Sequence, residues 1–279
     1  MRIASTPHCH TTFVDGKSTA EEMVRAAIAA GFVSLGFSEH GPQKIDPAYG
    51  LRNADIAVYR ETVLSLQKTY ARDLRIHLGI ERDLYSHADR ADYAYTIGAC
   101  HYFLYGDDDN PSFCPVDGNF EELRAYRDNL LGGDGAGVAV RYFEMAGRYA
   151  AQYRPDIFAH FDLIKKQNRD ARLYDPNDPR VVKAAFDALE RIRESGALLE
   201  VNTGGMARGY MDAPYPDMRY LKRWNRMGGR VIVGSDCHFA PHIAFGFDVV
   251  PDTLLQAGFE TAWRLGAAGE PLFVEFPIS

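Results

Sequence analysis

The chain has 279 residues, 46% of them hydrophobic and 25% charged, which is typical of a folded globular protein and not of a disordered or fibrous one. Its formal net charge of -7 and its lack of Lys/Arg blocks argue against nucleic acid as the main partner. No apolar run approaches the ~20 residues that a bilayer span needs, and the first ten residues are too polar for a signal peptide, so we expect a cytoplasmic protein without a membrane partner.

Strand-like apolar runs alternate with helical patterns along the chain, which indicates parallel strands joined by crossover helices. The clearest helix is STAEEMVRAAIAAG, where Ser18 and Glu21 have capping-box spacing and Gly31 can end the helix. Weaker helical periodicity covers residues 251–267, and the other predicted helices cover 54–72, 119–131, 138–153, 178–195 and 217–227. The segments YGDDDNPSFCPVDGN and GGDGAG are predicted loops. We find no repeat or linker, so residues 1–279 are expected to form one domain.

Seven strand-like runs carry a ligand-type or polar residue at their ends: IASTPHCH, VSLGFSEH, RIHLGIE, YTIGACH, PDIFAHFD, ALLEVNTGG and GRVIVGSDCH. In a parallel barrel the carboxyl ends of the strands share one face, where such folds place their chemistry. Six of the nine histidines fall at these ends, together with Glu81 and Asp236. His8 and His10 are two residues apart and would share one face of a strand. Any one of these histidines could be an ordinary polar residue, but so many imidazoles and carboxylates on one face predict bound cations.

The remaining candidates are weaker. His77 lies inside a strand pattern, His87 follows a polar loop, and His242 is a possible substrate-side residue. The four cysteines form no CxxC pair, and Cys9 and Cys237 are expected to be small buried residues facing away from their histidine neighbours.

These motifs, in this order, resemble the polymerase and histidinol phosphatase (PHP) superfamily, and within it the stand-alone histidinol-phosphatases. The resemblance runs from HCH through SEH, GIE, ACHY, AHFDLIKK and EVNTGG to GSDCH, followed by GFD. It implies an α/β fold, a distorted (β/α)7 barrel with a metal site at the C-terminal ends of its strands. It also implies two or three divalent metal ions, and the mixed ligands suit Zn, Mn or Fe without choosing among them.

The resemblance assigns the metal ligands by matching motif. One metal would be held by His8, His10, Glu81 and Asp236. Glu81 would bridge to a second metal, bound also by His101 and His160. A third would be held by His40, His238 and Asp15. Relatives can carry another ligand type at the loop position of Asp15, and without Asp15 as a ligand the third site would be weak or empty. Glu39 stands where Asp is common, and we expect it to orient a ligand His.

The implied reaction is hydrolysis of a small phosphate monoester, with L-histidinol phosphate as the expected substrate and water bound between two metals as the nucleophile. Asp236 would ligate and accept a proton, and His40 or His238 is a candidate general acid. Arg208, after the NTGG loop, is the first candidate for phosphate contact, although the family's basic residue would stand one position away.

Further substrate contacts were left open by the sequence. Lys165, Lys166 and Arg169 could contact phosphate or form a solvated helix start. The acidic residues of the long loop could receive the ammonium and imidazole of the substrate or lie in solvated turns: Asp107, Asp108, Asp109 and Asp117.

Two other functions are compatible with these residues. The first is a PHP-type phosphoesterase that acts on nucleotides or nucleic-acid ends, which keeps the fold and changes the substrate. The second is a non-catalytic metal-binding protein, whose metal sites would be closed by protein ligands. The sequence does not indicate an oligomeric state.

Overall fold

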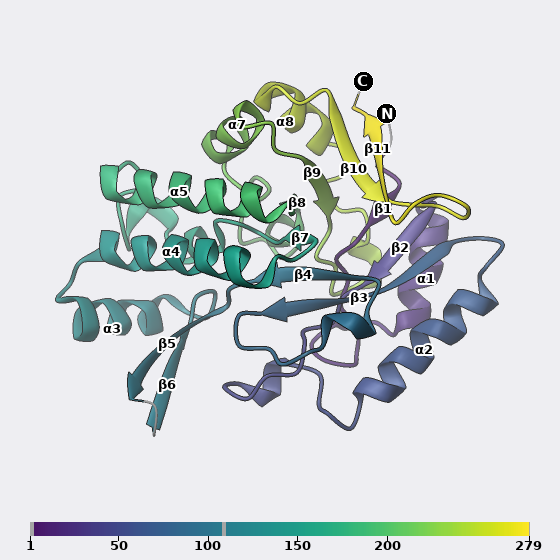
Figure 1. The fold of residues 1–279 in the computed structure, drawn as a ribbon, viewed down its shortest axis with the longest axis horizontal. Helices are drawn as coiled ribbons and strands as arrows, with labels where there is room; N and C mark the ends of the chain where they lie inside the picture. The colour runs from purple at the N-terminus through teal and green to yellow at the C-terminus, as the bar shows by residue number, and fades with distance from the viewer. Residues whose placement is uncertain (1–2, 108–109, 279) are drawn as a thin grey trace.

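The computed structural model of the protein describes residues 3–107 and 110–278 (Figure 1). A parallel sheet contains one strand from each of the seven predicted runs, and its strands are neighbours in chain order. These strands are β1 (Ser5–Thr6), β2 (Ser34–Phe37), β3 (Arg75–Asp83), β4 (Tyr95–Ala99), β7 (Ile157–Phe158), β8 (Leu198–Asn202) and β9 (Val231–Gly234). The order of parallel strands and crossover helices is that of a β/α barrel, as predicted.

The barrel closes differently at its two ends. At the carboxyl end, the N–H of His10 donates to the carbonyl of Cys237 at 2.8 Å, so the segments after β1 and β9 pair directly. At the amino end, β10 (Thr261–Leu265) pairs in parallel with β9 through Trp263 and Ile232, and antiparallel with β11 (Phe273–Pro277). The Ser34 hydroxyl donates to the carbonyl of Leu265 at 2.7 Å. The inserted strand β10 therefore distorts the (β/α)7 barrel at this end.

The helices cover the outside of the barrel. In Figure 1, α4 and α5 pack side by side on the opposite flank from α1 and α2, and both chain termini lie near β11. The α-helices are α1 (Ala20–Ala29), α2 (Ile56–Thr69), α3 (Phe120–Leu131), α4 (Gly135–Tyr153), α5 (Pro179–Ser195), α6 (Gly204–Ala207), α7 (Met218–Arg226) and α8 (Val250–Ala257). Short 3-10 helices cover Pro47–Tyr49, Arg90–Asp92, Leu163–Gln167, Arg169–Ala171 and Ala240–His242. No helix among the described residues is long and apolar enough to cross a membrane.

The barrel interior is filled by apolar side chains and one tyrosine. Tyr95 extends from β4 across Gly36 of β2 and Gly79 of β3, where a Cβ would lie 2.0 Å and 2.3 Å, respectively, from the nearest Tyr95 atom. Its hydroxyl donates to the carbonyl of Pro7, next to His8. The rest of this interior cluster comprises Ile97, Ala99, Ile157, Ala159, Leu198, Ile232 and Leu265.

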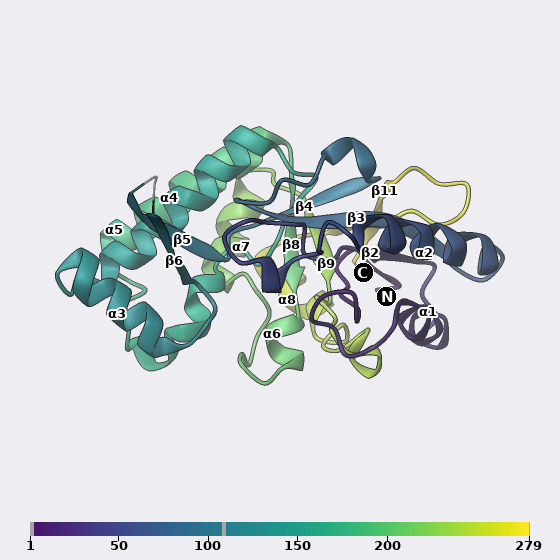
Figure 2. The same ribbon diagram turned by 90° about the horizontal axis from the view of Figure 1, so that it is seen from below.

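Four local predictions were wrong. The capping box of α1 uses Thr19 and Glu22, because the Ser18 hydroxyl instead accepts the N–H of Ala240 at 3.1 Å. The long predicted loop forms the antiparallel hairpin β5 (Tyr102–Asp107) and β6 (Asn110–Pro115), which projects from the barrel in Figures 1 and 2. The pattern over 251–267 is helical only in its first half, since Gly258 ends α8 with a φ of 93° and β10 follows.

The start of α4 also falls inside a predicted loop, since GGDGAG is helical from Gly135. The cysteine prediction is confirmed: Cys9 and Cys237 are 0% and 2% exposed, and all four cysteines are free.

Candidate metal centre

The nine predicted ligand residues lie together at the carboxyl end of the barrel, although they come from six strands and one loop. His8 and His10 follow β1, His40 follows β2, Glu81 lies in β3, His101 follows β4, and His160 follows β7. Asp236 and His238 follow β9, and Asp15 lies in the loop before α1. Side-chain distances of 2.9 to 3.9 Å connect all nine into one cluster.

Glu81 lies at the centre of the cluster and is 1% exposed. Its Oε2 is 2.9 Å from Nδ1 of His40, and 3.4 and 3.5 Å from Nε2 of His8 and His10. Its Oε1 faces the other side of the site, 3.2 Å from Nε2 of His160 and 3.7 Å from Nε2 of His101. Burial opposes ionisation, but the charges of His40, His8 and His101 outweigh it and hold the pKa of Glu81 well below its usual range. An ionised carboxylate with imidazoles on both sides can bridge two cations.

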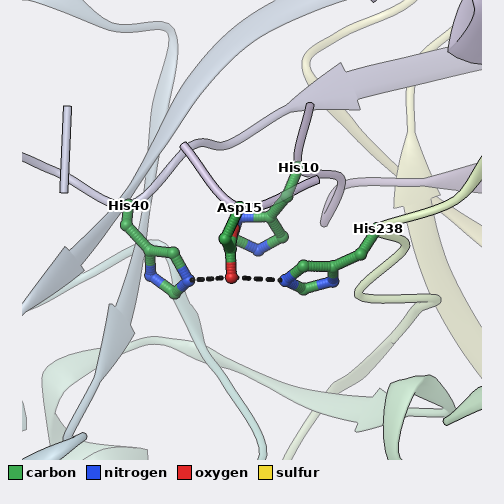
Figure 3. Close-up of side chains that lie close together, drawn as sticks. All are labelled: His10, Asp15, His40 and His238. Atoms are coloured by element: carbon green, nitrogen blue, oxygen red, sulfur yellow. Dashed lines mark hydrogen bonds and ion pairs between the residues drawn. The ribbon is translucent and has the colours of Figure 1, made fainter. Parts of the chain in front are cut away.

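Asp15 draws three histidines together at the open side of the cluster (Figure 3). Its Oδ2 is 3.2 Å from Nε2 of His238 and 3.8 Å from Nε2 of His40, and its Oδ1 is 3.9 Å from Nδ1 of His10. Burial would raise the pKa of Asp15, but the hydrogen bond to His238 and the charge of His40 lower it. Asp15, the predicted ligand that the sequence supported least, therefore lies among the histidines as an anion.

Asp236 joins the histidine cluster to Arg208. Its Oδ1 is 3.4 Å from Nε2 of His10, and its Oδ2 accepts from Nη2 of Arg208 at 2.8 Å. Arg208 also donates through Nη1 to Nδ1 of His238 at 2.8 Å. Burial opposes ionisation of Asp236, but Arg208 and His8 hold its pKa well below its usual range. At Gly204, which opens α6, any Cβ would lie 2.7 Å from Oδ2 of Asp236, so glycine keeps this carboxylate in place.

Two carboxylates that sequence analysis did not single out hold the histidines in position. Glu200 of β8 lies 2.8 Å from Nδ1 of His8 through its Oε1, and its Oε2 accepts the N–H of His160 at 3.2 Å. Asp83 accepts the N–H of His101 at 2.7 Å and lies 3.2 Å from its Nδ1. Such contacts fix the tautomer and ring orientation of a ligand histidine. The available signal for Asp83 was its position two residues after Glu81, on the same face of β3.

Glu39 has a different role from the one expected. Its Oε1 accepts from the N–H and hydroxyl of Thr11 at 2.7 and 2.5 Å, while its Oε2 is 3.9 Å from Nδ1 of His10. Burial raises the pKa of Glu39 to about 8. Glu39 therefore anchors the backbone after β1, and within the described residues it makes no hydrogen bond to a histidine ring.

Several buried ring nitrogens of the cluster, which could bind a metal ion, have no hydrogen-bond partner among the described residues. They are Nε2 of His8, both ring nitrogens of His10 and Nδ1 of His160. Leaving such groups unpaired costs about 1–3 kcal/mol each, so native structures rarely tolerate it. Burial and the neighbouring His238 and His40 lower the pKa of His10 to about 3, which leaves its ring in the neutral form that binds metal. The donor set therefore fits divalent metal ions.

The two lysines after β7 are paired and are not part of a solvated helix start. Lys166 lies 3.0 Å from Asp117 and is 14% exposed, and Lys165 lies 3.1 Å from the buried Asp162. Arg169 is exposed. Burial opposes ionisation of Asp117, but Lys166 and His101 lower its pKa, so this residue is an anion beside the cluster and not in a solvated turn.

The other candidates lie away from the cluster or outside the described residues. Asp107 is exposed on the hairpin, and Asp108 and Asp109 are outside the described residues. His77 lies 2.9 Å from the carbonyl of Gly266, His87 is exposed, and His242 packs between Phe239 and Phe245.

The barrel and its cluster define the class of protein, an α/β barrel with a buried cluster of metal-ligand residues at its carboxyl end, and comparisons with known proteins place it in a family. The PHP domain model matches residues 7–204, and the chain belongs to this family as a PHP-family phosphoesterase. The chain is similar to "Probable histidinol-phosphatase" of Schizosaccharomyces pombe, with 22% identity over 92% of this chain and 87% of the relative. It is also similar to histidinol-phosphatase of Bacillus subtilis, with 23% identity over 86% of this chain and 96% of the relative.

A solved structure shares the fold. Histidinol phosphate phosphatase of Lactococcus lactis subsp. lactis, complexed with zinc, L-histidinol and phosphate, matches with a TM-score of 0.68 and 18% identity, covering 94% of this chain and 96% of that chain.

Proposed function

We propose that the protein is a metal-dependent phosphatase that hydrolyses L-histidinol phosphate to L-histidinol and phosphate. The observation that carries the proposal is the buried cluster of histidines and carboxylates with unpartnered ring nitrogens at the carboxyl end of the barrel. The names of the relatives support the substrate.

We further propose that the nine clustered residues hold two or three divalent metal ions. Three groups of donor atoms support this: His8, His10 and Asp236; His40, Glu81 and His101; and His10, Asp15, His40 and His238. His160, 3.2 Å from Glu81, would complete the second of these groups. When bound, the metals would neutralise phosphoryl oxygens and lower the pKa of bound water, which supplies a nucleophile near neutral pH.

The residues around the metals would position the phosphate ester. Arg208 presents its guanidinium beside Asp236 and is 32% exposed, so its remaining N–H groups can reach phosphoryl oxygens. With two metals bound, His238, hydrogen-bonded to Arg208, or His40 would protonate the leaving alkoxide, and Asp236 would accept a proton from the attacking water. With a third metal bound, both rings would be ligands, and the charge of the alkoxide would be neutralised at the metal site instead. Asp117, an anion near His101, would accept a hydrogen bond from the ammonium or imidazole of the substrate.

The proposal is tested by measuring phosphate release from L-histidinol phosphate by chelated protein to which Zn, Mn or Fe is restored, beside a panel of sugar phosphates and nucleotides. We expect metal-dependent turnover selective for L-histidinol phosphate. Turnover of nucleotides or 3′-phosphorylated oligonucleotides alone would replace the substrate and keep the metal-dependent reaction. Metal binding without turnover of any ester would contradict catalysis.

Asp236→Asn separates the role of this carboxylate from the rest of the site. We expect a loss of at least about 100-fold in kcat, because the variant loses both a metal ligand and a proton acceptor. Asp212→Asn, at an exposed position, is the matched control and should keep full activity. Near-normal turnover and metal content in Asp236→Asn would contradict the mechanism.

We also propose that residues 1–279 form a single domain and that the protein is cytoplasmic. The core that joins both halves of the barrel supports the first statement, and four unpaired buried cysteines support the second.

A further inference from the structure

A cavity lies at the opposite end of the barrel from the histidine cluster. It has a volume of about 510 Å³ and is lined by residues of the segments that lead into strands: Arg90 before β4, Asp156 before β7, Gly196 before β8 and Arg230 before β9. Since parallel strands share their direction, these residues lie at the amino ends, while the cluster lies at the carboxyl ends. The cavity is within the range of about 300–1,000 Å³ typical of small-molecule sites.

The walls of this amino-end cavity carry an excess of positive charge. Among its lining residues are three arginines, Arg90, Arg154 and Arg230, and a single carboxylate, Asp156, which gives a formal charge of +3 − 1 = +2. This excess is local, because the whole chain has a net charge of -7. Both oxygens of Asp156 are already hydrogen-bonded, since Arg90 donates to its Oδ1 at 2.6 Å and Thr96 donates to its Oδ2 through N–H at 2.8 Å.

Arg154 and Arg230 keep most of their hydrogen-bonding capacity. Arg154 donates from Nη2 to the carbonyl of Glu194 at 3.4 Å, and Arg230 donates from Nη2 to the carbonyl of Gly196 at 2.8 Å. Both contacts cap the end of α5, but each uses one of the five N–H groups of a guanidinium. Within residues 3–107 and 110–278 neither arginine has a carboxylate within 4.0 Å. Capping therefore explains only part of what these two side chains can bind.

Aromatic rings form another wall of the cavity. Trp263 of β10 and Phe273 of β11 line it and are half-buried, and the Arg230 guanidinium lies 5.1 Å from the Trp263 ring centroid. A guanidinium beside an indole suits a ligand with a flat ring and an anionic group, since the ring can stack and the anion can pair.

We propose that the amino-end cavity binds a small organic anion that carries a planar ring, with its phosphate, phosphonate or carboxylate group on Arg154 and Arg230 and its ring against Trp263. This site is separate from the metal centre and does not depend on the proposed phosphatase reaction.

Tryptophan fluorescence of the metal-loaded protein tests the proposal, because the chain has only two tryptophans and the other, Trp224, is 0% exposed. Phenylphosphonate is the probe, since its C–P bond resists phosphatases. We expect a saturable change in Trp263 emission with a dissociation constant of about 1 mM or below. Methylphosphonate, which lacks the ring, and benzyl alcohol, which lacks the anion, should bind at least about tenfold more weakly.

Variants assign the signal to the site. Trp263→Phe should abolish the response, and the Arg154→Gln/Arg230→Gln double variant should weaken binding at least about tenfold, because the anion loses its charge-assisted hydrogen bonds. The Arg52→Gln/Arg72→Gln double variant removes the same number of charges at exposed positions and should bind as the parent does. Thermal melting verifies that each variant is folded. No saturable response, or equal binding by the double variant, would overturn the proposal, and equal binding of benzyl alcohol or methylphosphonate would do the same.

Discussion

Glu200 shows how a single buried carboxylate can orient the centre of the site. It lies 2.8 Å from Nδ1 of His8, and this contact turns Nε2 of His8 toward Glu81 and Asp236. The carboxylate fits because position 234 is glycine, where a Cβ would lie 1.8 Å from Oε1 of Glu200. Burial opposes protonation of His8, but the charges of Glu200 and Glu81 outweigh it and raise the pKa of His8 well above its usual value.

Glu200→Gln should therefore weaken metal binding by about 10–100-fold, the usual effect of removing the carboxylate behind a ligand histidine. The measurement is competition with a chromophoric chelator. Glu190→Gln is the matched control, because Glu190 is exposed and contacts Arg223 at 2.7 Å. Unchanged affinity in Glu200→Gln would show that His8 does not need this contact to bind metal.

The sequence predicted the ligand residues at the ends of strands better than the buried carboxylates that orient those ligands. His8, His40 and Asp236 could be grouped because parallel strands place their carboxyl ends on one face. Glu200 was not singled out because it stands inside an apolar run, and its partner His8 is 192 residues away. An acidic residue inside a strand pattern is identified as an orienting group only when the neighbouring strand is known.

At the scale of elements, one side chain of β4 spans the neighbouring strands β3 and β2 and reaches the segment after β1. Tyr95 crosses over Gly36 and Gly79 and donates to the carbonyl of Pro7, which precedes His8. The absence of side chains at these two positions thus lets the interior tyrosine reach the backbone that carries the first histidine pair.

Gly79→Ala should lower the free energy of unfolding by about 1–3 kcal/mol, because its Cβ would overlap the Tyr95 ring and overpack the barrel interior. Urea denaturation measures this change. Gly137→Ala, in the first turn of α4, is the control. The three atoms nearest to its Cβ, at 2.9 Å and beyond, belong to the flexible side chain of Asp134, so we expect a neutral or slightly stabilising effect. Equal stability of Gly79→Ala and the parent would mean that the ring can move aside without cost.

The elements that the sequence did not predict are strands that lie outside the set of seven parallel strands and form antiparallel pairs. The seven parallel strands and the principal helices follow from periodicity. The β5–β6 hairpin was predicted to be a loop because Gly, Asp, Asn and Pro dominate it, yet Phe103 and Cys114 pair across it and are buried, and Phe103 stacks on Tyr126 of α3 at 4.8 Å. Strand β10 was predicted to be helical because its pairing with β9 and β11 is not visible in its own residues.

At the scale of the whole molecule, the metal centre and the closure of the barrel coincide. The backbone of His8 and His10 pairs with Cys237, while their side chains enter the cluster with Asp236. A bound metal would therefore connect the first and the last strands of the sequence-predicted barrel, and its binding free energy should add to the stability of the fold.

Removal of metal should lower the melting temperature by several degrees, since ligand present at about 1,000 times its dissociation constant stabilises a fold by about 4 kcal/mol. Calorimetry before and after chelation, with Zn, Mn or Fe added back, measures the shift. Asp236→Asn should show a smaller difference between the two states. An unchanged melting temperature in the parent would contradict metal binding at the closure of the barrel.

At the opposite end, His77 of β3 contacts the loop after β10, with its Nε2 2.9 Å from the carbonyl of Gly266. Burial, reinforced by Arg75, lowers its pKa below the unfolded value of 6.5, so the unfolded chain binds the extra proton first as the pH falls. Protonation of the unfolded chain at His77 therefore lowers the free energy of unfolding as the pH falls below about 6.5, and His77 has no such effect above that pH.

His77→Gln keeps a donor for the carbonyl of Gly266 but does not titrate. Urea denaturation should therefore show that the free energy of unfolding of this variant falls less steeply between about pH 7 and pH 5. The difference in slope from the parent should be at most about 1.4 kcal/mol per pH unit. His87→Gln, at an exposed position, should retain the parental slope, and equal slopes in all three proteins would contradict a buried neutral His77.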